Sequence, residues 1–306
     1  MTDFTTSVRR LFFADQETVT VWVPTATNQA GSFDLGTNGS LMCGAQTSGP
    51  SLLWTTVDLW RMTYLGQPFV FSFQQVGANC GIISKHAFAV VDASAFWMGA
   101  ANFYLYDGFV KPIPCEVQDY VFGDLSSDYA YKIWGLNNAA YGEVTWFYPS
   151  SASTSCDRYV TFNYRENHWT VGTLGRAAGV SSAAPGTVPV MIDESGNVYD
   201  HETGTDFNNE GTASLESGPV EIGSGDRLML ITGFVPDDKT VGDVNVTLYG
   251  ANYPDDAETT YGPFTLTSWS TFIAKARQVR VKFTQVTATA WRIGTVRLSG
   301  RLGSKR

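Results

Sequence analysis

Short apolar segments separated by turn-forming residues recur along most of the chain, and they limit its fold more than any other feature. Each segment is bounded by Gly, Asn, Asp or Ser, which is typical of β-strands joined by tight turns. Examples are "ETVTVWV" (17–23), "QPFVFSF" (67–73), "NFYLYDG" (102–108) and "RYVTFNY" (158–164). The pattern predicts an all-β protein with almost no helix. Only "SLLWTTVDLWRM" (51–62) fits a helical period as well as a strand period.

The composition agrees with a globular β protein. Aromatic residues make up 14% of the 306 residues and there are 30 glycines, which suits pleated sheets with many tight turns. The net charge of -9 opposes binding to nucleic acid through a broad basic face. The sequence shows neither an N-terminal export signal nor an apolar run long enough for a membrane span, so we expect a soluble protein.

A weak internal repeat indicates the architecture. "VVDASAFWMG" (90–99) and "MIDESGNVYD" (191–200) share two apolar residues, an Asp, a turn and an apolar strand, and "AAYGEVTWFY" (139–148) lies near their midpoint. A repeat of about 50 residues with about four strands is the size of a propeller blade. Unrelated hairpins in a β-sandwich are the alternative. We therefore predict β-propeller-like four-stranded blades over residues 1–207.

The pattern changes in the last third of the chain. "VNVTLYG" (244–250), "GPFTLTS" (262–268) and "QVRVKFTQV" (278–286) alternate apolar and polar residues more regularly than the earlier segments. Such alternation is typical of antiparallel strands with one buried and one solvated face. We predict that residues 208–306 supply closing strands and a C-terminal antiparallel β-sandwich-like module.

The cysteines and histidines give little sign of nucleophilic or metal chemistry. Cys43, Cys80, Cys115 and Cys156 form no CxxC motif or Cys/His ligand pair, so we expect free thiols in the core. His168 follows Cys156 by twelve residues in "ENHWTVGTLGR" (166–176). A Cys/His dyad stays open, but no strand-to-helix elbow surrounds either residue, which favours a structural histidine in a turn.

Seven carboxylates are candidates for acid–base work, because two of them within about 5 to 10 Å would resemble a glycosidase pair. They are Glu143, Asp157, Glu166, Asp193, Glu194, Asp200 and Glu202. Residues 193–197, "DESGN", are more typical of a hairpin tip. Oxygen ligands at Asp193, Ser195, Asn197 and Asp206 lack the glycine and glutamate spacing of an EF-hand loop, so no metal site is predicted.

Aromatic side chains could stack on sugars, but packing between sheets is the favoured interpretation. The set is Trp97, Tyr104, Tyr106, Trp134, Trp146, Tyr148 and Trp169. "GTLGRAAG" (172–179) has the glycines of a phosphate loop without a following helix to bind an anion. We therefore predict no cofactor, and we expect Arg176 at the surface or an interface.

The order of motifs in "GEVTWFYPSSASTSCDRYVTFNYRENHWTVGTLGRAAG" (142–179) resembles a blade of the tail hub proteins, also called nozzle or tail accessory proteins, of short-tailed bacteriophages. The residues that carry the resemblance are Glu143, Trp146, Tyr148, Pro149, Asp157, Tyr159, Asn163, Tyr164, Trp169, Gly172 and Arg176. Segments such as "VYDHETG" (198–204), "ARQVRVKF" (276–283) and "WRIGTVRLSGRLGSKR" (291–306) resemble the closing part of that family. Residues 1–141 resemble it only as generic blades.

The resemblance implies a non-enzymatic virion protein, assembled in the host cytoplasm and located in the phage tail. Such hubs form homo-oligomeric rings, typically hexamers, below the portal and adaptor proteins, and they continue and gate the DNA channel for genome ejection. The acidic charge would let DNA pass without specific binding. The resemblance places six arginines at subunit or partner contacts: Arg176, Arg277, Arg280, Arg292, Arg297 and Arg301.

The chain departs from the family in length, because its blade region holds only four or five repeats of about 50 residues. An open or smaller propeller, a split gene product, and a propeller completed by another chain are the three explanations. Two other functions remain as alternatives: a carbohydrate-binding or glycoside-cleaving propeller, and a receptor-binding tail tip. A sugar site would join two carboxylates to exposed tryptophan rings, whereas a tail tip would expose aromatic residues.

Overall fold

The computed structural model describes residues 8–181, 188–205, 212–221, 225–235, 243–266, 270–295 and 297–305. The chain divides into two compact units, Met1–Glu202 and Thr203–Arg306, here called the blade unit and the sandwich unit. The boundary expected from the sequence, after residue 207, lies outside the described residues. No helix in the described ranges is long and apolar enough to span a membrane.

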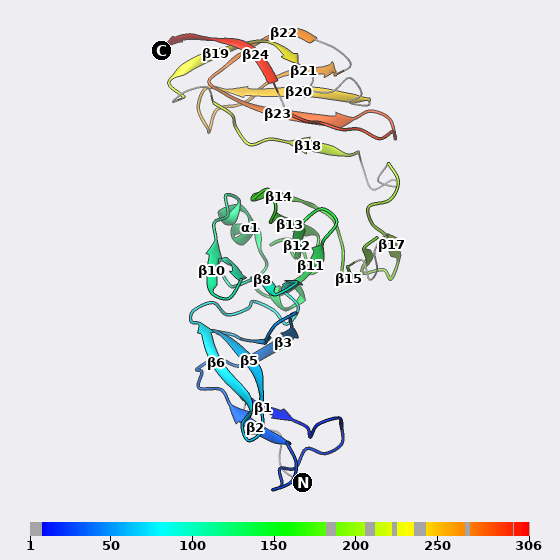
Figure 1. The fold of residues 1–306 in the computed structure, drawn as a ribbon. Coiled ribbons are helices and arrows are strands. Elements are labelled where there is room, and N and C mark those ends of the chain that lie inside the picture. Colours follow the sequence, from blue (N-terminus) through cyan, green and yellow to red (C-terminus); the bar gives the residue numbers. More distant parts are fainter. Residues whose placement is uncertain are drawn as a thin grey trace. The chain divides into compact units, whose positions relative to one another are not determined.

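The blade unit contains three consecutive four-stranded antiparallel sheets in which each strand pairs with the next one along the chain (Figure 1). The first sheet consists of β3 (Leu41–Gln46), β4 (Ser51–Thr55), β5 (Leu59–Gly66) and β6 (Val70–Gly77). The second consists of β7 (Phe88–Val91), β8 (Ser94–Met98), β9 (Phe103–Tyr106) and β10 (Val110–Ile113). The third consists of β11 (Trp134–Asn138), β12 (Glu143–Tyr148), β13 (Arg158–Asn163) and β14 (His168–Thr173).

A fourth sheet of three strands follows, made of β15 (Ala178–Val180), β16 (Val190–Ile192) and β17 (Val198–Asp200). The four sheets begin at Leu41, Phe88, Trp134 and Ala178, which are 47, 46 and 44 residues apart. The predicted blade-like repeat of about 50 residues is therefore confirmed. The sequence "ENHWTVGTLGR" is the outer strand β14 with the turn before it, as expected.

Aromatic side chains fill the space between successive sheets. Trp54 of the first sheet lies 4.9 Å from Phe88 of the second, measured between ring centroids. Phe103 of the second sheet lies 5.0 Å from Trp146 of the third. Both tryptophans are fully buried, so each joins two repeats in one core. A single sheet cannot bury either of its own faces. Stacking between repeats therefore buries the apolar side chains and stabilises the unit.

A small two-stranded sheet covers the outer face of the first blade. It pairs β1 (Arg10–Phe13) with β2 (Gly31–Asp34) in antiparallel register. Phe33 of β2 stacks on Phe73 of β6 at a centroid distance of 4.2 Å. Leu35, just after β2, is buried with Trp60 of β5. The first blade is thus packed on both of its faces.

One detail of the sequence interpretation needs correction. The proposed match of Asp92 with Asp193 is out of register, because Asp92 lies between the first and second strands of its sheet and Asp193 between the second and third. Both positions are tight turns, and similar turn chemistry produced the false match. For residues 51–62 the sequence left helix and strand open, and the structure shows the strand alternative, the hairpin of β4 and β5. The short helix α1 (Gln118–Asp124) and the 3-10 turn η1 (Ala130–Lys132) connect the second and third sheets instead.

The sandwich unit packs two antiparallel sheets around one apolar core, as the alternation predicted. One sheet has the order β18 (Ser214–Glu216), β23 (Gln278–Gln285), β20 (Val244–Ala251) and β21 (Thr259–Thr265). The other has the order β22 (Ser270–Ala276), β19 (Arg227–Val235) and β24 (Arg297–Lys305). Strict alternation of buried and partly exposed residues in β20 and β23 separates the core face from the solvated face.

Candidate functional site

A groove of about 650 Å³ lies in the blade unit where the first strands of three sheets come together. Its lining includes His86, Phe88, Tyr131, Lys132, Trp134, Gly135, Cys156, Ala177, Ala178, Gly179 and Glu194. The backbone amide of Gly135 donates to the carbonyl of His86 at 2.8 Å, which fixes the second sheet against the third. A Cβ atom at Gly179 would lie 2.9 Å from the ring of Trp134, so glycine permits the close approach of β15.

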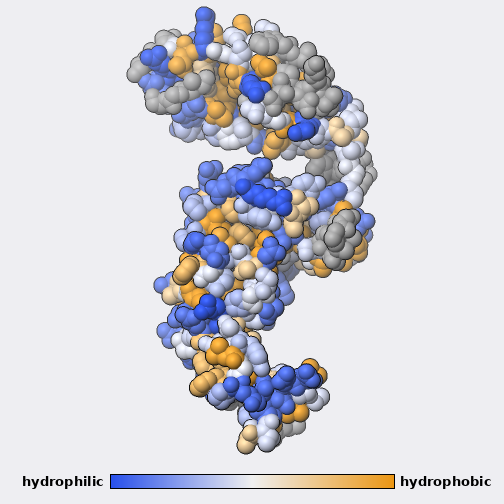
Figure 2. All heavy atoms as spheres, in the orientation of Figure 1, coloured by the Kyte–Doolittle hydropathy of each residue, from blue (hydrophilic) through white to orange (hydrophobic). Residues whose placement is uncertain are grey.

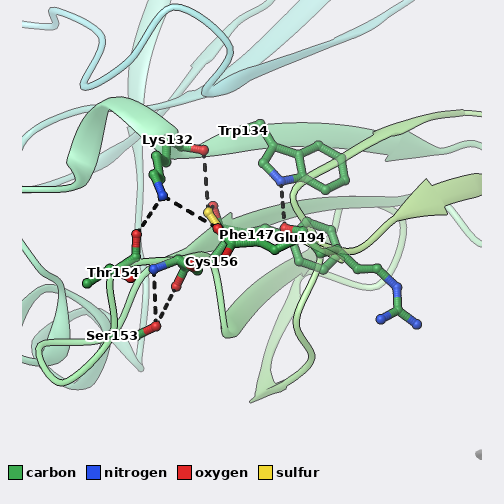
Figure 3. Close-up of polar contacts among 9 residues, drawn as sticks. Lys132, Trp134, Phe147, Ser153, Thr154, Cys156 and Glu194 are labelled. Carbon is green, nitrogen blue, oxygen red and sulfur yellow. Dashed lines mark hydrogen bonds and ion pairs between the residues drawn. The ribbon is translucent and has the colours of Figure 1, made fainter. Parts of the chain in front are cut away.

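The groove is built on Trp134, but the ring of this residue is structural. It stacks on Phe147 at a centroid distance of 4.5 Å and is only 6% exposed. Its Nε1 donates to the carbonyl oxygen of Arg176 at 3.1 Å (Figure 3). A ring held in this way presents little of its face to a ligand. This side chain therefore supports packing between sheets rather than sugar stacking.

Lys132 and Glu194 at the rim of the groove form an ion pair, so that their charges offset each other. Lys132 Nζ donates to the carbonyl of Thr154 at 2.7 Å and approaches Glu194 Oε1 at 3.4 Å (Figure 3). Glu194 is the carboxylate among the residues that line the groove. Acid–base cleavage of a glycosidic bond needs two carboxylates about 5 to 10 Å apart. The groove lining does not provide such a pair.

The cysteines are free, as predicted, and burial makes their thiols poor nucleophiles. Cys156 is 4% exposed, and its Sγ lies 3.4 Å from the carbonyl oxygen of Lys132 and 3.6 Å from that of Phe147. Desolvation raises the pKa of Cys156 and of Cys43 to about 12, and that of Cys80 and of Cys115 to about 11. Thiolates are therefore scarce at neutral pH.

His168 is an exposed residue at the start of β14, just after the turn. Its Nδ1 lies 3.6 Å from Glu166 Oε2, the partner that the structure gives it. Asn167, immediately before it, has a φ of +56°, which completes the reversal of the chain. This arrangement agrees with a turn histidine. No hydrogen bond joins His168 to Cys156 among the described residues.

Two of the seven candidate carboxylates come close to each other at one end of the third sheet. Glu143 Oε1 accepts from Asn163 Nδ2 at 3.5 Å, and Glu202 Oε1 accepts from Asn138 Nδ2 at 3.1 Å. Desolvation raises the pKa of both carboxyls, and their mutual repulsion adds to the shift at Glu143. Neither residue lines the groove.

Two more of the candidate carboxylates hold turns. Asp157 accepts hydrogen bonds from the amide and the hydroxyl of Ser150, both at 2.8 Å. Asp193 accepts from the amide and the side chain of Asn197, both at 2.9 Å, and from the hydroxyl of Tyr199 at 3.0 Å. Those bonds lower the pKa of the Asp193 carboxyl.

The hairpin-tip interpretation of residues 193–197 is therefore confirmed. Asp206, which completes the calcium-loop pattern considered from the sequence, lies outside the described residues. Within the described ranges, no three His, Cys, Asp or Glu side chains are grouped as metal ligands would be.

The surface position expected for Arg176 is wrong. Its side chain is 5% exposed, lies over the ring of Tyr199 at 4.0 Å from the centroid, and donates to His201 Nε2 at 3.0 Å. The loop after β14 turns inward, and Arg176 Nη1 also donates to the carbonyl of Gly175 at 2.7 Å. Arg176 thus fixes the fourth sheet to the third.

The other five predicted arginines belong to the sandwich unit. Arg280 forms a bidentate pair with Glu258, contacts Glu216 and lies 5.0 Å from the ring centroid of Tyr249. Arg277 lies 5.2 Å from the ring centroid of Tyr253. The remaining three, Arg292, Arg297 and Arg301, are exposed. Their assignment to subunit contacts stays a prediction.

The groove itself has no signal in the sequence. His86, Lys132 and Glu194 come from three different repeats and belong to no motif of fixed spacing. His86 precedes β7, Lys132 ends η1 and Glu194 lies between β16 and β17, and these segments meet where the second, third and fourth sheets stack. By contrast, the predicted aromatic set is found between the sheets, with Trp97, Trp146 and Tyr148 fully buried.

Comparison with known proteins gives a weak structural likeness. No protein family matches the chain, and no curated protein matches it. An exo-β-1,3-galactanase from Phanerochaete chrysosporium, solved with galactose, is 9% identical with a TM-score of 0.26, and the match covers 82% of this chain and 77% of that one. A variant of that enzyme with β-1,3-galactotriose is 8% identical with a TM-score of 0.28, covering 90% and 85%. A likeness this weak does not define the fold. The description of the sheets as blades therefore rests on the strand order of this chain.

Proposed function

We propose that this protein is a non-catalytic structural subunit of a phage tail, forming a hub or nozzle ring below the portal and adaptor that continues and gates the DNA channel. The motif order of residues 142–179 suggested this function. The partners would be further copies of the chain, the portal and adaptor proteins, and other tail components. DNA would pass the acidic wall without specific binding.

One observation carries the proposal: within the blade unit, the four sheets form an open array whose last sheet packs on a sheet of its own unit with one face only. The fourth sheet has three strands, and its outer face exposes Val180 and Val198 at 62% and 65%. A self-contained propeller closes by packing its last blade on its first. An open array is instead suited to assembly with other chains, which is the work of a ring subunit.

The chemistry of the blade unit supports a structural role over a catalytic one. Desolvation raises the pKa of all four thiols, the groove lining includes one carboxylate, and Trp54, Trp97 and Trp146 are fully buried. These features are what a protein needs to hold repeats together. They are not what acyl transfer or glycoside cleavage requires.

A glycan-cleaving propeller is the second candidate, and Glu143 and Glu202 are the observation that favours it. A carboxyl with a raised pKa is suited to general-acid catalysis, and two such groups lie at one end of the third sheet. Each already accepts a hydrogen bond from an asparagine of β11 or β13. Hydrolysis of β-linked oligosaccharides by the wild type, lost in Glu143→Gln and Glu202→Gln, would establish this candidate.

Light scattering coupled to gel filtration tests the proposed function directly. The full chain is measured alone over a range of concentrations, and again with the adaptor protein of the same virion. We expect a discrete ring in at least one of the two samples, visible as such by electron microscopy. A chain that stays monomeric in both samples would contradict the proposal.

A further inference from the structure

We infer that His201 is a pH switch inside the blade unit: with a neutral ring it holds the fourth sheet on the third through Arg176, and protonation of the ring loosens the fourth sheet. Both residues belong to the blade unit, so the contact between them is internal to it. The inference goes beyond the proposed function, because it concerns how the last sheet is held and not what the chain assembles with.

The backbone of Arg176 is fixed to the third sheet. Its amide donates to the carbonyl of Cys156 at 3.2 Å, and its carbonyl accepts from Trp134 Nε1 at 3.1 Å. Trp134 belongs to β11, and Cys156 lies in the loop between β12 and β13. Arg176 therefore extends its side chain from a fixed point on the third sheet.

The guanidinium of Arg176 contacts two rings of the fourth sheet. It lies over Tyr199 of β17, with 4.0 Å between Cζ and the ring centroid, and its Nε donates to His201 Nε2 at 3.0 Å. Arg176 is 5% exposed, so its charge lies beneath the mixed hydrophilic and hydrophobic surface that Figure 2 shows for the blade unit. Water screens a charge at such a depth only weakly.

His201 is in turn fixed to the fourth sheet. It directly follows β17, and its amide donates to the carbonyl of Pro189 at 2.8 Å, one position beyond the pairing of Val190 with Asp200. Side chains alternate along a strand, so Tyr199 and His201 lie on one face and Asp200 on the other. Both rings therefore approach the guanidinium from the same face of the fourth sheet.

The hydrogen bond from Arg176 requires a neutral His201. An arginine side chain has only donors and keeps its charge, so the nitrogen that it contacts must carry a lone pair. Nε2 of His201 is therefore the acceptor, and the ring proton belongs to Nδ1. Protonation of Nε2 would replace this hydrogen bond with a contact between two cations. Histidine ordinarily titrates at about pH 6.5, so mild acid suffices.

Two carboxyls of the fourth sheet lie beside this contact. Asp193 Oδ2 accepts from the hydroxyl of Tyr199 at 3.0 Å, which fixes the ring that Arg176 covers. Hydrogen bonds lower the pKa of the Asp193 carboxyl, so it stays ionised in mild acid. Asp200 lies on the opposite face of β17 from His201. The loss of the His201 hydrogen bond is therefore the expected response of this face to mild acid.

The carboxyls toward the third sheet respond to pH in the opposite sense. Glu202 Oε1 accepts from Asn138 Nδ2 of β11 at 3.1 Å, and Glu143 of β12 lies close enough to repel Glu202. Desolvation raises the pKa of both carboxyls, so the folded state favours their neutral forms. Their contribution to stability therefore rises as pH falls, whereas that of His201 is lost. The sign of the pH response distinguishes the two causes.

We expect a local opening rather than unfolding of the whole blade unit. Met191 of β16 is buried beside Trp134 and stays packed by apolar contact, which does not depend on pH. The core that joins the first three sheets contains neither Arg176 nor His201. Loss of their hydrogen bond should therefore affect β15–β17 first.

Hydrogen exchange of the full chain, measured by mass spectrometry at about pH 8 and about pH 5.5 and corrected for the intrinsic rates, tests this directly. We expect opening of β16 and β17 to be about tenfold more frequent at the lower pH, which is one unit below the ordinary titration of histidine. The third sheet should change little. Equal protection of β16 and β17 at the two pH values would overturn the inference, as would an equal loss in the third sheet.

Substitutions separate the switch from a structural role of His201. His201→Gln keeps an acceptor that takes up no proton, so β16 and β17 should stay protected at both pH values. His201→Lys carries a charge at both, and exchange should be fast at both. The matched control is His168→Gln, an exposed histidine of β14, which should retain the wild-type response. A wild-type response in His201→Gln would overturn the inference.

Arg176→Met tests the other partner of the contact. Without the guanidinium, protonation of His201 creates no pair of cations. The fourth sheet should therefore open more often at both pH values, but by a factor that no longer depends on pH. A tenfold pH response that persists in Arg176→Met would overturn the role of Arg176.

Nitrogen NMR of the wild type labelled at histidine gives a readout that needs no variant to fold. The chain has three histidines, His86, His168 and His201, so few signals need assignment. At neutral pH we expect the His201 signal of the tautomer with Nε2 unprotonated, since this nitrogen accepts from Arg176. A proton on Nε2 at neutral pH would overturn the inference.

Discussion

The blade unit and the sandwich unit bury their cores in opposite ways. In the sandwich unit, two sheets enclose one core, and β20 and β23 alternate strictly between buried and partly exposed residues. In the blade unit, apolar side chains point from both faces of a sheet, so that each repeat needs a neighbour on either side. A sandwich buries its core between its own two sheets. In a stack of blades, the first and the last sheet each need a further layer to cover their outer faces.

The polar contacts follow the same division. The solvated face of the sandwich unit is crossed by Arg280, which joins Glu216 of β18 to Glu258 near β21. In the blade unit, Asp58 is buried within the first blade and Arg176 is buried between the third and fourth sheets, at 5% exposure each. Loss of a buried polar group costs more than loss of an exposed one. This contrast ranks the expected effects of substitutions.

The largest effect is expected for Trp146→Ala, which removes a fully buried ring between the second and third sheets. Substitutions of this kind cost about 3 to 5 kcal/mol. Hydrogen exchange measured by mass spectrometry should show faster exchange throughout the blade unit and little change in the sandwich unit. Phe283→Ala, at 3% exposure in the other core, should give the reverse pattern. Equal loss of protection in both units would mean that they unfold together.

A smaller loss is expected for Asp58→Asn in the first blade. The Asp58 carboxylate accepts from Thr37 Oγ1 at 2.7 Å, from Trp60 Nε1 at 3.1 Å and from Gln75 Nε2 at 3.1 Å. An amide cannot accept all of these bonds, so we expect a loss of about 1 to 3 kcal/mol in urea denaturation. Asp34→Asn, an exposed carboxylate paired with Arg10, is the control and should change stability less. A neutral Asp58→Asn would show that the buried network contributes little.

Arg280→Met should cost about 1 kcal/mol or less, because the side chain is 30% exposed and its ion pairs are screened by solvent. The loss should shrink further at high salt, which urea denaturation at two ionic strengths would reveal. Arg292→Met, an exposed arginine of the same unit, should change stability by less than about 0.5 kcal/mol. A salt-independent loss would point to packing of the arginine on Tyr249 instead.

The smallest effect, of opposite sign, is expected for Glu143→Gln. Burial raises the pKa of Glu143 above its ordinary value of 4.5, so the folded state binds the proton more readily than the unfolded state. The ionised carboxylate therefore destabilises the fold at neutral pH, and stability is regained as pH falls toward the acid range. The variant should melt on the order of 1 to 3 °C higher at pH 7 and depend less on pH. Glu166→Gln, which is exposed, should not show this gain.

The sequence by itself determined the β class, the repeat length and the change of pattern before the sandwich unit. These properties follow from local rules: turn residues end strands, and the alternation of side chains reports which faces are buried. The aromatic residues between sheets and the free thiols were predictable for the same reason. The order of strands within each repeat also follows, because neighbouring antiparallel strands need only short turns.

Only the tertiary structure decided how the repeats align and what their stacking leaves uncovered. The false match of Asp92 with Asp193 shows that turn chemistry does not fix the register between repeats. Arg176 is buried because a loop turns inward onto Tyr199, and the groove joins His86, Lys132 and Glu194 from three repeats. Such contacts depend on packing between strands that are tens of residues apart.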